Sequence, residues 1–341
     1  MTATFSWAQT INRLLDGQPL DEDTTSAAMT EIMEGAATPA QVAGFVIALR
    51  AKGETVDEVA GLVKTMRSFS ARISVSGELL DTCGTGGDRT GTFNVSTAAA
   101  LVCAGAGAKV AKHGNRAASS RCGSADVLEA LGVKIDLPPD DVAACIEQSG
   151  MGFCFAPVFH PAMRHAAVPR RELGVATIFN FLGPLTNPAG ATRQALGVSD
   201  PRMVDIMIET LGRLGSTKVL AFHGAGGLDE LSTAGPSYVV ELNRGEITRW
   251  AIDPDDLDLA PAPLEELAGG TAEDNAAMIR DLLGGAKGPR RDVVVLNAAA
   301  GLVAADLVRD IRGGLAAAAE AIDSGRAGEA LDRLVEVSSS L

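Results

Sequence analysis

The most constraining feature of the sequence is a glycine-rich stretch between a short apolar run and the start of a helical pattern. The apolar run covers residues 79–82, the motif Gly-Thr-Gly-Gly-Asp follows at residues 84–88, and the helical pattern begins after Asn94. Glycine lets backbone N–H groups approach an anion closely, and the first turn of a helix adds free N–H groups and a favourable dipole. The stretch therefore predicts a phosphate-binding loop; the alternative is an ordinary tight turn in which Ser96 caps the helix.

The spacing of these glycines differs from that of two familiar phosphate-binding motifs. The dinucleotide-binding fingerprint Gly-x-Gly-x-x-Gly is not matched, because the glycines fall at positions 84, 86 and 87. No Gly-Lys-Ser/Thr ending follows, so the P-loop pattern is not matched either. We therefore infer neither a dinucleotide-binding fold nor a P-loop enzyme.

Two patterns divide the chain near residue 73. Residues 1–72 read as helices, with starts at Thr38 and Thr55, each followed three positions later by a capping-box Gln or Glu. From residue 73 to residue 341, short apolar runs alternate with helical stretches, which is typical of a mostly parallel sheet flanked by helices. We predict an α/β protein with a small N-terminal all-helical domain (1–72) and a larger α/β domain (73–341). The expected strands are 79–82, 109–112, 152–155, 195–198, 219–222 and 293–296, with a hairpin over 238–250.

Composition narrows the possible partners and the compartment. The net charge of −14 disfavours nucleic acid as a partner, so any anionic ligand requires a local positive field. Five cysteines without a C-x-x-C pair indicate neither a disulfide framework nor a zinc site, and fit a reduced, cytoplasmic protein. The N-terminus lacks the pattern of a signal peptide, and no apolar run reaches about 18 residues, so we expect no membrane span.

A second polar stretch, residues 112–124, combines three cations with several small polar groups. Lys112 and the serine hydroxyls, including Ser119, Ser120 and Ser124, are suited to phosphate oxygens, while His113 and Asn115 can hydrogen-bond a second ligand. The alternative is a solvated loop.

Adjacent carboxylates, Asp229 and Glu230, follow a Gly-rich turn just after another expected strand. Mg²⁺ prefers oxygen ligands and often bridges substrate phosphates, and open α/β sheets bind ligands at the carboxyl ends of their strands. The pair therefore predicts a magnesium site, against the alternative of solvated surface.

An apolar helical stretch rich in arginine, residues 160–182, contains Pro169 and leads into a Gly-Pro turn at Gly183. We expect the proline to divide it into two short helices that could return to the N-terminal helices. An arginine among apolar walls is suited to an aromatic acid, although an amphipathic connector with solvated arginines is the alternative.

Together these stretches resemble the anthranilate phosphoribosyltransferases, tryptophan-pathway members of the nucleoside phosphorylase-type glycosyltransferases, nearly end to end. Residues 84–88 alone also resemble pyrimidine nucleoside phosphorylases. The stretches 112–116 (Lys-His-Gly-Asn-Arg) and 179–188 (Phe-Asn-Phe-Leu-Gly-Pro-Leu-Thr-Asn-Pro) are much more specific. The remaining alternatives are a pyrimidine nucleoside phosphorylase-like enzyme and a non-catalytic nucleic-acid-binding relative.

The resemblance implies a fold, a reaction and a set of site residues. Residues 165–188 would join the helical domain, the protein would be a homodimer, and anthranilate and phosphoribosyl pyrophosphate would react in a cleft with two Mg²⁺ ions per subunit. Phosphoribosyl pyrophosphate would contact Gly84, Gly86, Gly87, Asp88, Thr92, Asn94, Ser96, Thr97, Lys112 and Ser124. Anthranilate would contact Gly84, His113, Asn115, Arg170 and Gly183, with Arg170 at the carboxylate and His113 orienting the amine or accepting a proton. Mg²⁺ would contact Ser96, Asp229 and Glu230.

Two positions depart from the pattern of the resemblance. Arg89 stands where the family commonly has glycine, and the order Val168-Pro169-Arg170 replaces Pro-Val-Arg. We expect Arg89 to change the mobility of the phosphate loop or to add a phosphate contact, and Pro169 to shift Arg170.

Overall fold

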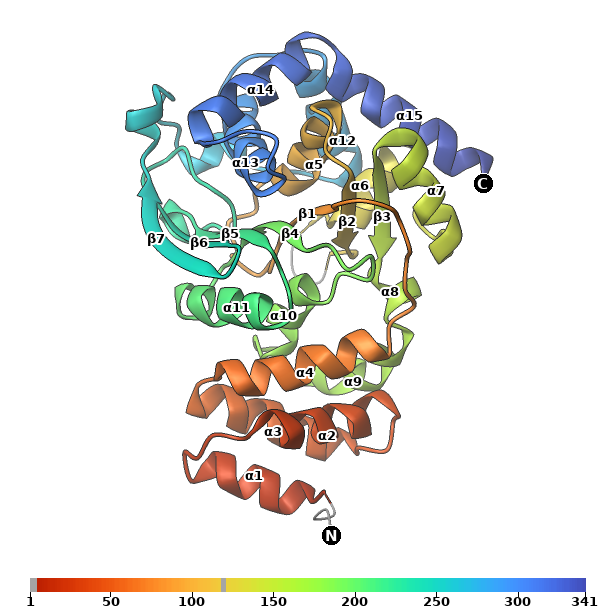
Figure 1. Cartoon of the computed structure of the whole chain (residues 1–341), viewed down its shortest axis with the longest axis vertical. Helices are drawn as coiled ribbons and strands as arrows, with labels where there is room; N and C mark the ends of the chain where they lie inside the picture. Colours follow the sequence, from red (N-terminus) through yellow and green to blue (C-terminus); the bar gives the residue numbers. More distant parts are fainter. Residues whose placement is uncertain (1–4, 118–120) are drawn as a thin grey trace.

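The computed structural model describes residues 5–117 and 121–341. Its N-terminal part is a layer of four helices, which lies at the bottom of Figure 1: α1 (Trp7–Leu15), α2 (Glu22–Met33), α3 (Pro39–Lys52) and α4 (Val56–Ser68). The two expected capping boxes are present, since Thr38 and Thr55 accept from the backbone at Gln41 and Glu58, whose side chains accept in return. These local signals define where α3 and α4 begin.

A single seven-stranded sheet crosses the middle of the molecule in the order β3-β2-β1-β4-β5-β6-β7 (Figure 1). The strands are β1 (Leu80–Gly84), β2 (Val110–Gly114), β3 (Met151–Phe155), β4 (Arg193–Gly197), β5 (Lys218–His223), β6 (Ser237–Asn243) and β7 (Glu246–Ile252). The first five are parallel, and β6 and β7 form an antiparallel hairpin at one edge. The predicted fold class, a small helical domain and a larger α/β domain with a mostly parallel sheet, is confirmed.

Two apolar clusters hold the layers together. The first lies between one face of the sheet and the helices α5 (Val95–Gly105), α6 (Ser124–Ala130), α7 (Pro139–Ser149), α12 (Ala272–Leu283), α13 (Pro289–Ala304), α14 (Ile311–Asp323) and α15 (Arg326–Ser340). The second joins the opposite face to α11 (Pro201–Arg213), the N-terminal helices and the segment with α9 (Arg164–Leu173) and α10 (Phe179–Leu182). The second cluster therefore runs without a break from the helical layer to the sheet.

Short helical turns fill several connections. They are α8 (Ala156–Phe159) and the 3-10 helices η1 (Pro161–Met163), η2 (Gly183–Leu185), η3 (Ala225–Gly227), η4 (Pro254–Leu257) and η5 (Leu264–Leu267). None of the helices within 5–117 and 121–341 is long and apolar enough to cross a lipid bilayer.

One predicted strand is wrong. Residues 293–296 lie in the middle of α13, where all four side chains are buried. A short run of Val and Leu has the same appearance in a fully buried helix as in a parallel strand, so periodicity does not distinguish them. The helix begins at Pro289, a favoured first position, and continues through an alanine-rich stretch.

The stretch contains two short helices as expected, α9 and α10, but the expected break at Pro169 is wrong. Helix α9 runs through this residue and ends at Gly174, whose φ of 61° gives the left-handed cap. The proline side chain is buried, and α9 packs against α2 and α3, which supports a helix that lacks one backbone hydrogen bond at the proline.

Candidate active site

The polar motifs meet at the carboxyl ends of the parallel strands β1, β2 and β5. The loop 84–88 leaves β1, the stretch from His113 leaves β2, and the loop that carries Asp229 and Glu230 follows β5. Because parallel strands end at one edge of a sheet, segments far apart in sequence become neighbours there.

The glycine loop is tied directly to the acidic pair. Gly86 and Gly87 have φ angles of 69° and 79°, a region that side-chain-bearing residues enter at a cost. The backbone N–H of Gly86 donates to Asp229 Oδ2 at 2.7 Å, and that of Thr85 donates to the Gly197 carbonyl at 3.0 Å. The loop therefore has a defined shape, held by contacts to the end of β4 and to the loop that follows β5.

Asp229 and Glu230 are desolvated acids. Glu230 Oε1 accepts from the backbone N–H of Ser96 at 3.0 Å, in the first turn of α5. Burial raises the pKa of both carboxyl groups, and the nearby charge of Asp88 adds to the shift at Asp229, whose pKa is raised to about 7. Such a pair is fully ionised only beside a cation.

Lys112 supplies a buried cation next to these acids. Its side chain is 1% exposed, and Nζ donates to the carbonyl of Thr82 and to Ser96 Oγ. Burial lowers the pKa of Lys112, and the carboxylate of Asp81 opposes that shift.

Asp81 and Asn187 form a supporting network that we did not predict as functional. Asp81 Oδ1 accepts from the backbone N–H of His113 at 3.1 Å, and Oδ2 accepts from Asn187 Nδ2 at 2.8 Å. Asn187 also donates to the carbonyl of Ala111 at 2.8 Å. Asp81 lies inside the expected strand 79–82, and Asn187 lies in the stretch 179–188. A polar side chain inside a buried strand needs a hydrogen-bond partner, so Asp81 was the residue from which this network could have been predicted.

The start of α5 excludes one alternative. Ser96 lies inside the helix and Asn94 is the N-cap, but the Asn94 side chain makes no capping hydrogen bond. It donates to the carbonyl of Cys122 and accepts from Asn275 instead. The interpretation of Ser96 as an ordinary N-cap is therefore wrong, and Thr97 is buried with no hydrogen-bond partner for its hydroxyl in the described part of the chain.

His113 is held as a neutral imidazole with its second nitrogen unpaired. Nδ1 lies 3.0 Å from the Gly183 carbonyl, which can only accept, so Nδ1 carries the proton. Nε2 is buried, and no hydrogen-bond partner for it exists among residues 5–117 and 121–341. Burial lowers the pKa of His113 to about 3, and the ring of His160, with its centroid 5.1 Å away, contributes.

Arg170 lies on α9. Its guanidinium lies over the Phe179 ring, 5.6 Å from the centroid, and burial lowers its pKa. Within the described ranges no carboxylate forms an ion pair with it. The group therefore combines an aromatic contact with an unneutralised positive charge.

The other predicted residues lie around this centre. Asn115 is exposed and accepts from the Arg116 backbone, while Ser124 begins α6 and donates to the Asn115 carbonyl at 3.3 Å. Thr92 is half-buried in a bridge to Ala268. Ser119 and Ser120 lie outside the described residues.

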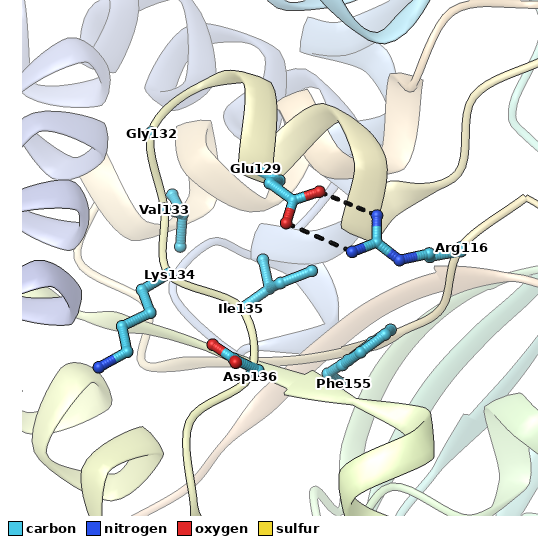
Figure 2. Close-up of a pocket in the computed structure, with 8 residues that line it drawn as sticks. All are labelled: Arg116, Glu129, Gly132, Val133, Lys134, Ile135, Asp136 and Phe155. Atoms are coloured by element: carbon cyan, nitrogen blue, oxygen red, sulfur yellow. Dashed lines mark hydrogen bonds and ion pairs between the residues drawn. The ribbon is translucent and has the colours of Figure 1, made fainter.

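A cavity of about 290 Å³ adjoins the site but does not contain it. Figure 2 shows its lining, in which the Arg116 guanidinium faces the Glu129 carboxylate. Those two groups pair at 2.9 Å, and Arg116 also pairs with Asp126 at 2.8 Å. The cavity shares only Arg116 with the predicted motifs, and that cation is already neutralised.

Comparison with known proteins identifies the family. The α/β domain of a glycosyl transferase family matches residues 76–328, and the helical bundle domain of such a family matches residues 8–70. An anthranilate phosphoribosyltransferase from Arthrobacter sp. (strain FB24) is 54% identical over 336 residues, which cover 97% of this chain and 95% of the relative. The chain belongs to the anthranilate phosphoribosyltransferase family.

Solved structures of anthranilate phosphoribosyltransferases have the same fold. The enzyme from Thermus thermophilus is 47% identical with a TM-score of 0.91, and the match covers 97% of this chain and 99% of that one. The enzyme from Saccharomyces cerevisiae in complex with phosphoribosyl pyrophosphate and Mg is 27% identical with a TM-score of 0.89, and the match covers 100% and 99%. The likeness to this family therefore extends over both the helical and the α/β regions.

Proposed function

We propose that this protein transfers the 5-phosphoribosyl group of phosphoribosyl pyrophosphate to the amine of anthranilate. The products are N-(5-phosphoribosyl)anthranilate and pyrophosphate, and the reaction is the second step of tryptophan biosynthesis from chorismate. One observation carries the proposal: a glycine loop with Lys112 and paired acids lies at the same sheet edge as a neutral His113. The first group is suited to a pyrophosphate with metal, and the second to an uncharged amine.

The phosphate half of the site would hold the donor substrate through backbone and side-chain donors. The supporting features are the glycine loop, the buried Thr97 hydroxyl and the Lys112 ammonium. The proposed contacts are Gly84, Gly86, Gly87, Asp88, Thr92, Asn94, Ser96, Thr97, Lys112 and Ser124.

Asp229 and Glu230 can provide part of the oxygen ligands that Mg²⁺ requires, and the substrate and water would provide the rest. In the described ranges no three His, Cys, Asp or Glu side chains group as a metal cage. Mg²⁺ is commonly bound by one or two carboxylates with water and substrate phosphates completing the shell, and Asp229, Glu230 and Ser96 offer such oxygens. Mg²⁺ would neutralise the charge that develops on the departing pyrophosphate, and we propose two ions per subunit.

The anthranilate half would use Arg170 for the carboxylate and His113 for the amine. His113 Nε2 bears the lone pair and has no partner within the described chain, so it can accept a hydrogen bond from the attacking amine. Gly84, Asn115 and Gly183 would line the path, and a Cβ at Gly183 would meet nothing within 4 Å.

Catalysis would depend mainly on positioning, because an aromatic amine is neutral at pH 7 and needs no prior deprotonation. The two substrates would be aligned for in-line attack on the ribose C1, and oriented N–H groups would stabilise the leaving anion. We propose no covalent intermediate. Replacement of His113 by alanine should lower kcat roughly tenfold if His113 only orients the amine; a loss of roughly a thousandfold or more would assign it a general-base role.

We further propose the division of the chain and its assembly. Residues 1–72 with 165–188 would form the helical domain, and 73–341 the remainder, a division supported by the packing of α9 on α2 and α3. The protein would be a cytoplasmic homodimer, supported by five cysteines that form no disulfide and by exposed Leu15 and Ile47 on the helical layer. Sedimentation equilibrium would test the dimer.

The decisive experiment follows the fluorescence of free anthranilate with purified protein and phosphoribosyl pyrophosphate. Rapid loss of fluorescence with Mg²⁺, stopped by excess chelator, is the expected result. A well-folded sample that leaves anthranilate unchanged at every Mg²⁺ concentration would overturn the proposal. Release of base from uridine or thymidine with inorganic phosphate would then identify a phosphorylase.

A further inference from the structure

Gly197 closes strand β4 directly beneath the acidic pair. It is the register partner of Gly84 at the end of β1, so two glycines face each other across neighbouring parallel strands at the site edge of the sheet. Gly84 belongs to the glycine-rich motif, but Gly197 belongs to no motif and carries no side chain that could bind a ligand. Its φ is not positive, so conformational freedom does not account for glycine here.

The space above both glycines is filled by Asp229. A Cβ at Gly197 would overlap the carbonyl carbon and oxygen of Asp229 and lie 3.2 Å from its Cα. A Cβ at Gly84 would overlap Asp229 Oδ2 and lie 2.9 Å from Cγ. At Gly197 the obstacle is backbone, which cannot rotate away as a side chain can.

The loop after β5 explains why Asp229 lies there. The Gly224 N–H donates to the Leu228 carbonyl at 2.9 Å, which closes a small turn and sends the chain back across β4 toward β1. A Cβ at Gly224 would in turn overlap the Glu230 carbonyl oxygen. The backbone of residue 229 therefore packs directly against Gly197, and that of residue 230 packs directly against Gly224.

We propose that Gly197 is a positioning residue for the metal-binding acids: its lack of a side chain lets the Asp229 backbone sit against the ends of β1 and β4. This inference rests on the proposed function, in which Asp229 and Glu230 hold the metal. Displacement of the Asp229 carbonyl moves Oδ2 away from the Gly86 N–H, 2.7 Å distant, and Glu230 away from the Ser96 N–H, 3.0 Å distant. Both acids thereby lose their alignment with the phosphate loop.

The test is Gly197→Ala, with Gly328→Ala as the matched control. Gly328 lies in α15, and a Cβ there meets only the Leu283 carbonyl oxygen at 3.9 Å, an ordinary contact. The affinity of each folded protein for Mn²⁺ in the presence of inorganic pyrophosphate is measured by electron paramagnetic resonance, and folding is checked by circular dichroism. We expect at least tenfold weaker Mn²⁺ binding for Gly197→Ala and an unchanged affinity for Gly328→Ala.

Kinetics separate positioning from general damage to the fold. The Mg²⁺ concentration for half-maximal rate should rise at least tenfold in Gly197→Ala, while the KM for anthranilate stays within twofold. A folded Gly197→Ala protein with wild-type Mn²⁺ affinity would overturn the proposal. The Mn²⁺ comparison needs no anthranilate, so an inactive wild-type protein would contradict the transferase function without deciding the role of Gly197.

A second variant covers the case in which Gly197→Ala does not fold. Gly224→Ala lies in the loop after β5 rather than inside the sheet, and its Cβ presses on the same segment at Glu230. Mn²⁺ binding that is at least tenfold weaker supports the proposal that these glycines position the two acids. Wild-type affinity in folded Gly224→Ala refutes it.

Discussion

The two proposed halves of the site, one for phosphate and one for anthranilate, are built in different ways. The phosphate half uses strand ends and the loops that follow them, and its members are hydrogen-bonded to one another, as in the Gly86–Asp229 and Ser96–Glu230 contacts. The proposed anthranilate half would join His113, at the end of β2, to Arg170 on α9, which packs against α2 and α3. The first half is therefore fixed by the sheet, whereas the second depends on how the helical layer meets it.

This difference predicts different kinetic consequences. Changes in the phosphate half should affect the metal and the leaving group, and hence kcat. Changes in the anthranilate half should affect how well the acceptor is held, and hence its KM. The predictions below test this division.

The largest effect is expected from Asp229→Asn. The substitution keeps the shape and an acceptor for the Gly86 N–H but removes the charge that would hold the metal. We expect kcat to fall by roughly 10²–10³ with the KM for anthranilate nearly unchanged, because charge stabilisation by a metal contributes several kcal/mol. Steady-state kinetics at saturating Mg²⁺ would measure this, with exposed Asp136→Asn as the control. Full activity of Asp229→Asn would remove Asp229 from the metal site.

A smaller effect, confined to the acceptor, is expected from Arg170→Gln. A charged hydrogen bond contributes about 1.5–3 kcal/mol, so the KM for anthranilate should rise about 10- to 100-fold while the KM for phosphoribosyl pyrophosphate stays within threefold. Arg171→Gln is the matched control, since Arg171 is the next residue of α9 and is exposed. A fall in kcat alone would contradict the proposed contact with the carboxylate and the division between the halves.

Stability should also depend on pH through His160, whose ring lies beside that of His113. Burial lowers the pKa of His160 to about 4, well below its usual 6.5, so the unfolded chain takes up this proton first as the pH falls. Stability is therefore lost below about pH 6.5, by about 2 kcal/mol at pH 5 relative to pH 8. The difference in unfolding free energy between the wild type and His160→Gln, from urea denaturation at both pH values, should change by about this amount. A constant difference would mean that His160 is not held neutral.

The sequence was most informative where the residues of one motif lie close together along the chain. Residues 84–88 and the pair Asp229–Glu230 follow strands and Lys112 lies near the end of one, and the common edge of parallel strands then brings them together. The capping boxes at Thr38 and Thr55 were predictable for the same reason, because their partners are three residues away.

Features that depend on three-dimensional packing were not predictable in this way. The strand expected at 293–296 is part of a buried helix, because complete burial removes the alternation that separates the two structures. The helix through Pro169 is maintained by neighbouring helices. Gly197 has no sequence signal at all, since its role depends on the backbone of a residue 32 positions later.

The smallest effect is expected at Arg89, within the phosphate half. Arg89 has a φ of 60°, a conformation that glycine adopts without strain. Arg89→Gly and Arg89→Ala remove the same side-chain charge, but only glycine relieves the backbone, so Arg89→Gly should be more stable than Arg89→Ala by about 1 kcal/mol. Urea denaturation measures the difference, and kcat/KM should stay within threefold of wild type in Arg89→Gly because Asp229 and Gly197 still hold the loop. Equal stability of the two variants would show that position 89 does not have this backbone conformation in solution, and a large loss of activity in Arg89→Gly would make Arg89 a phosphate contact.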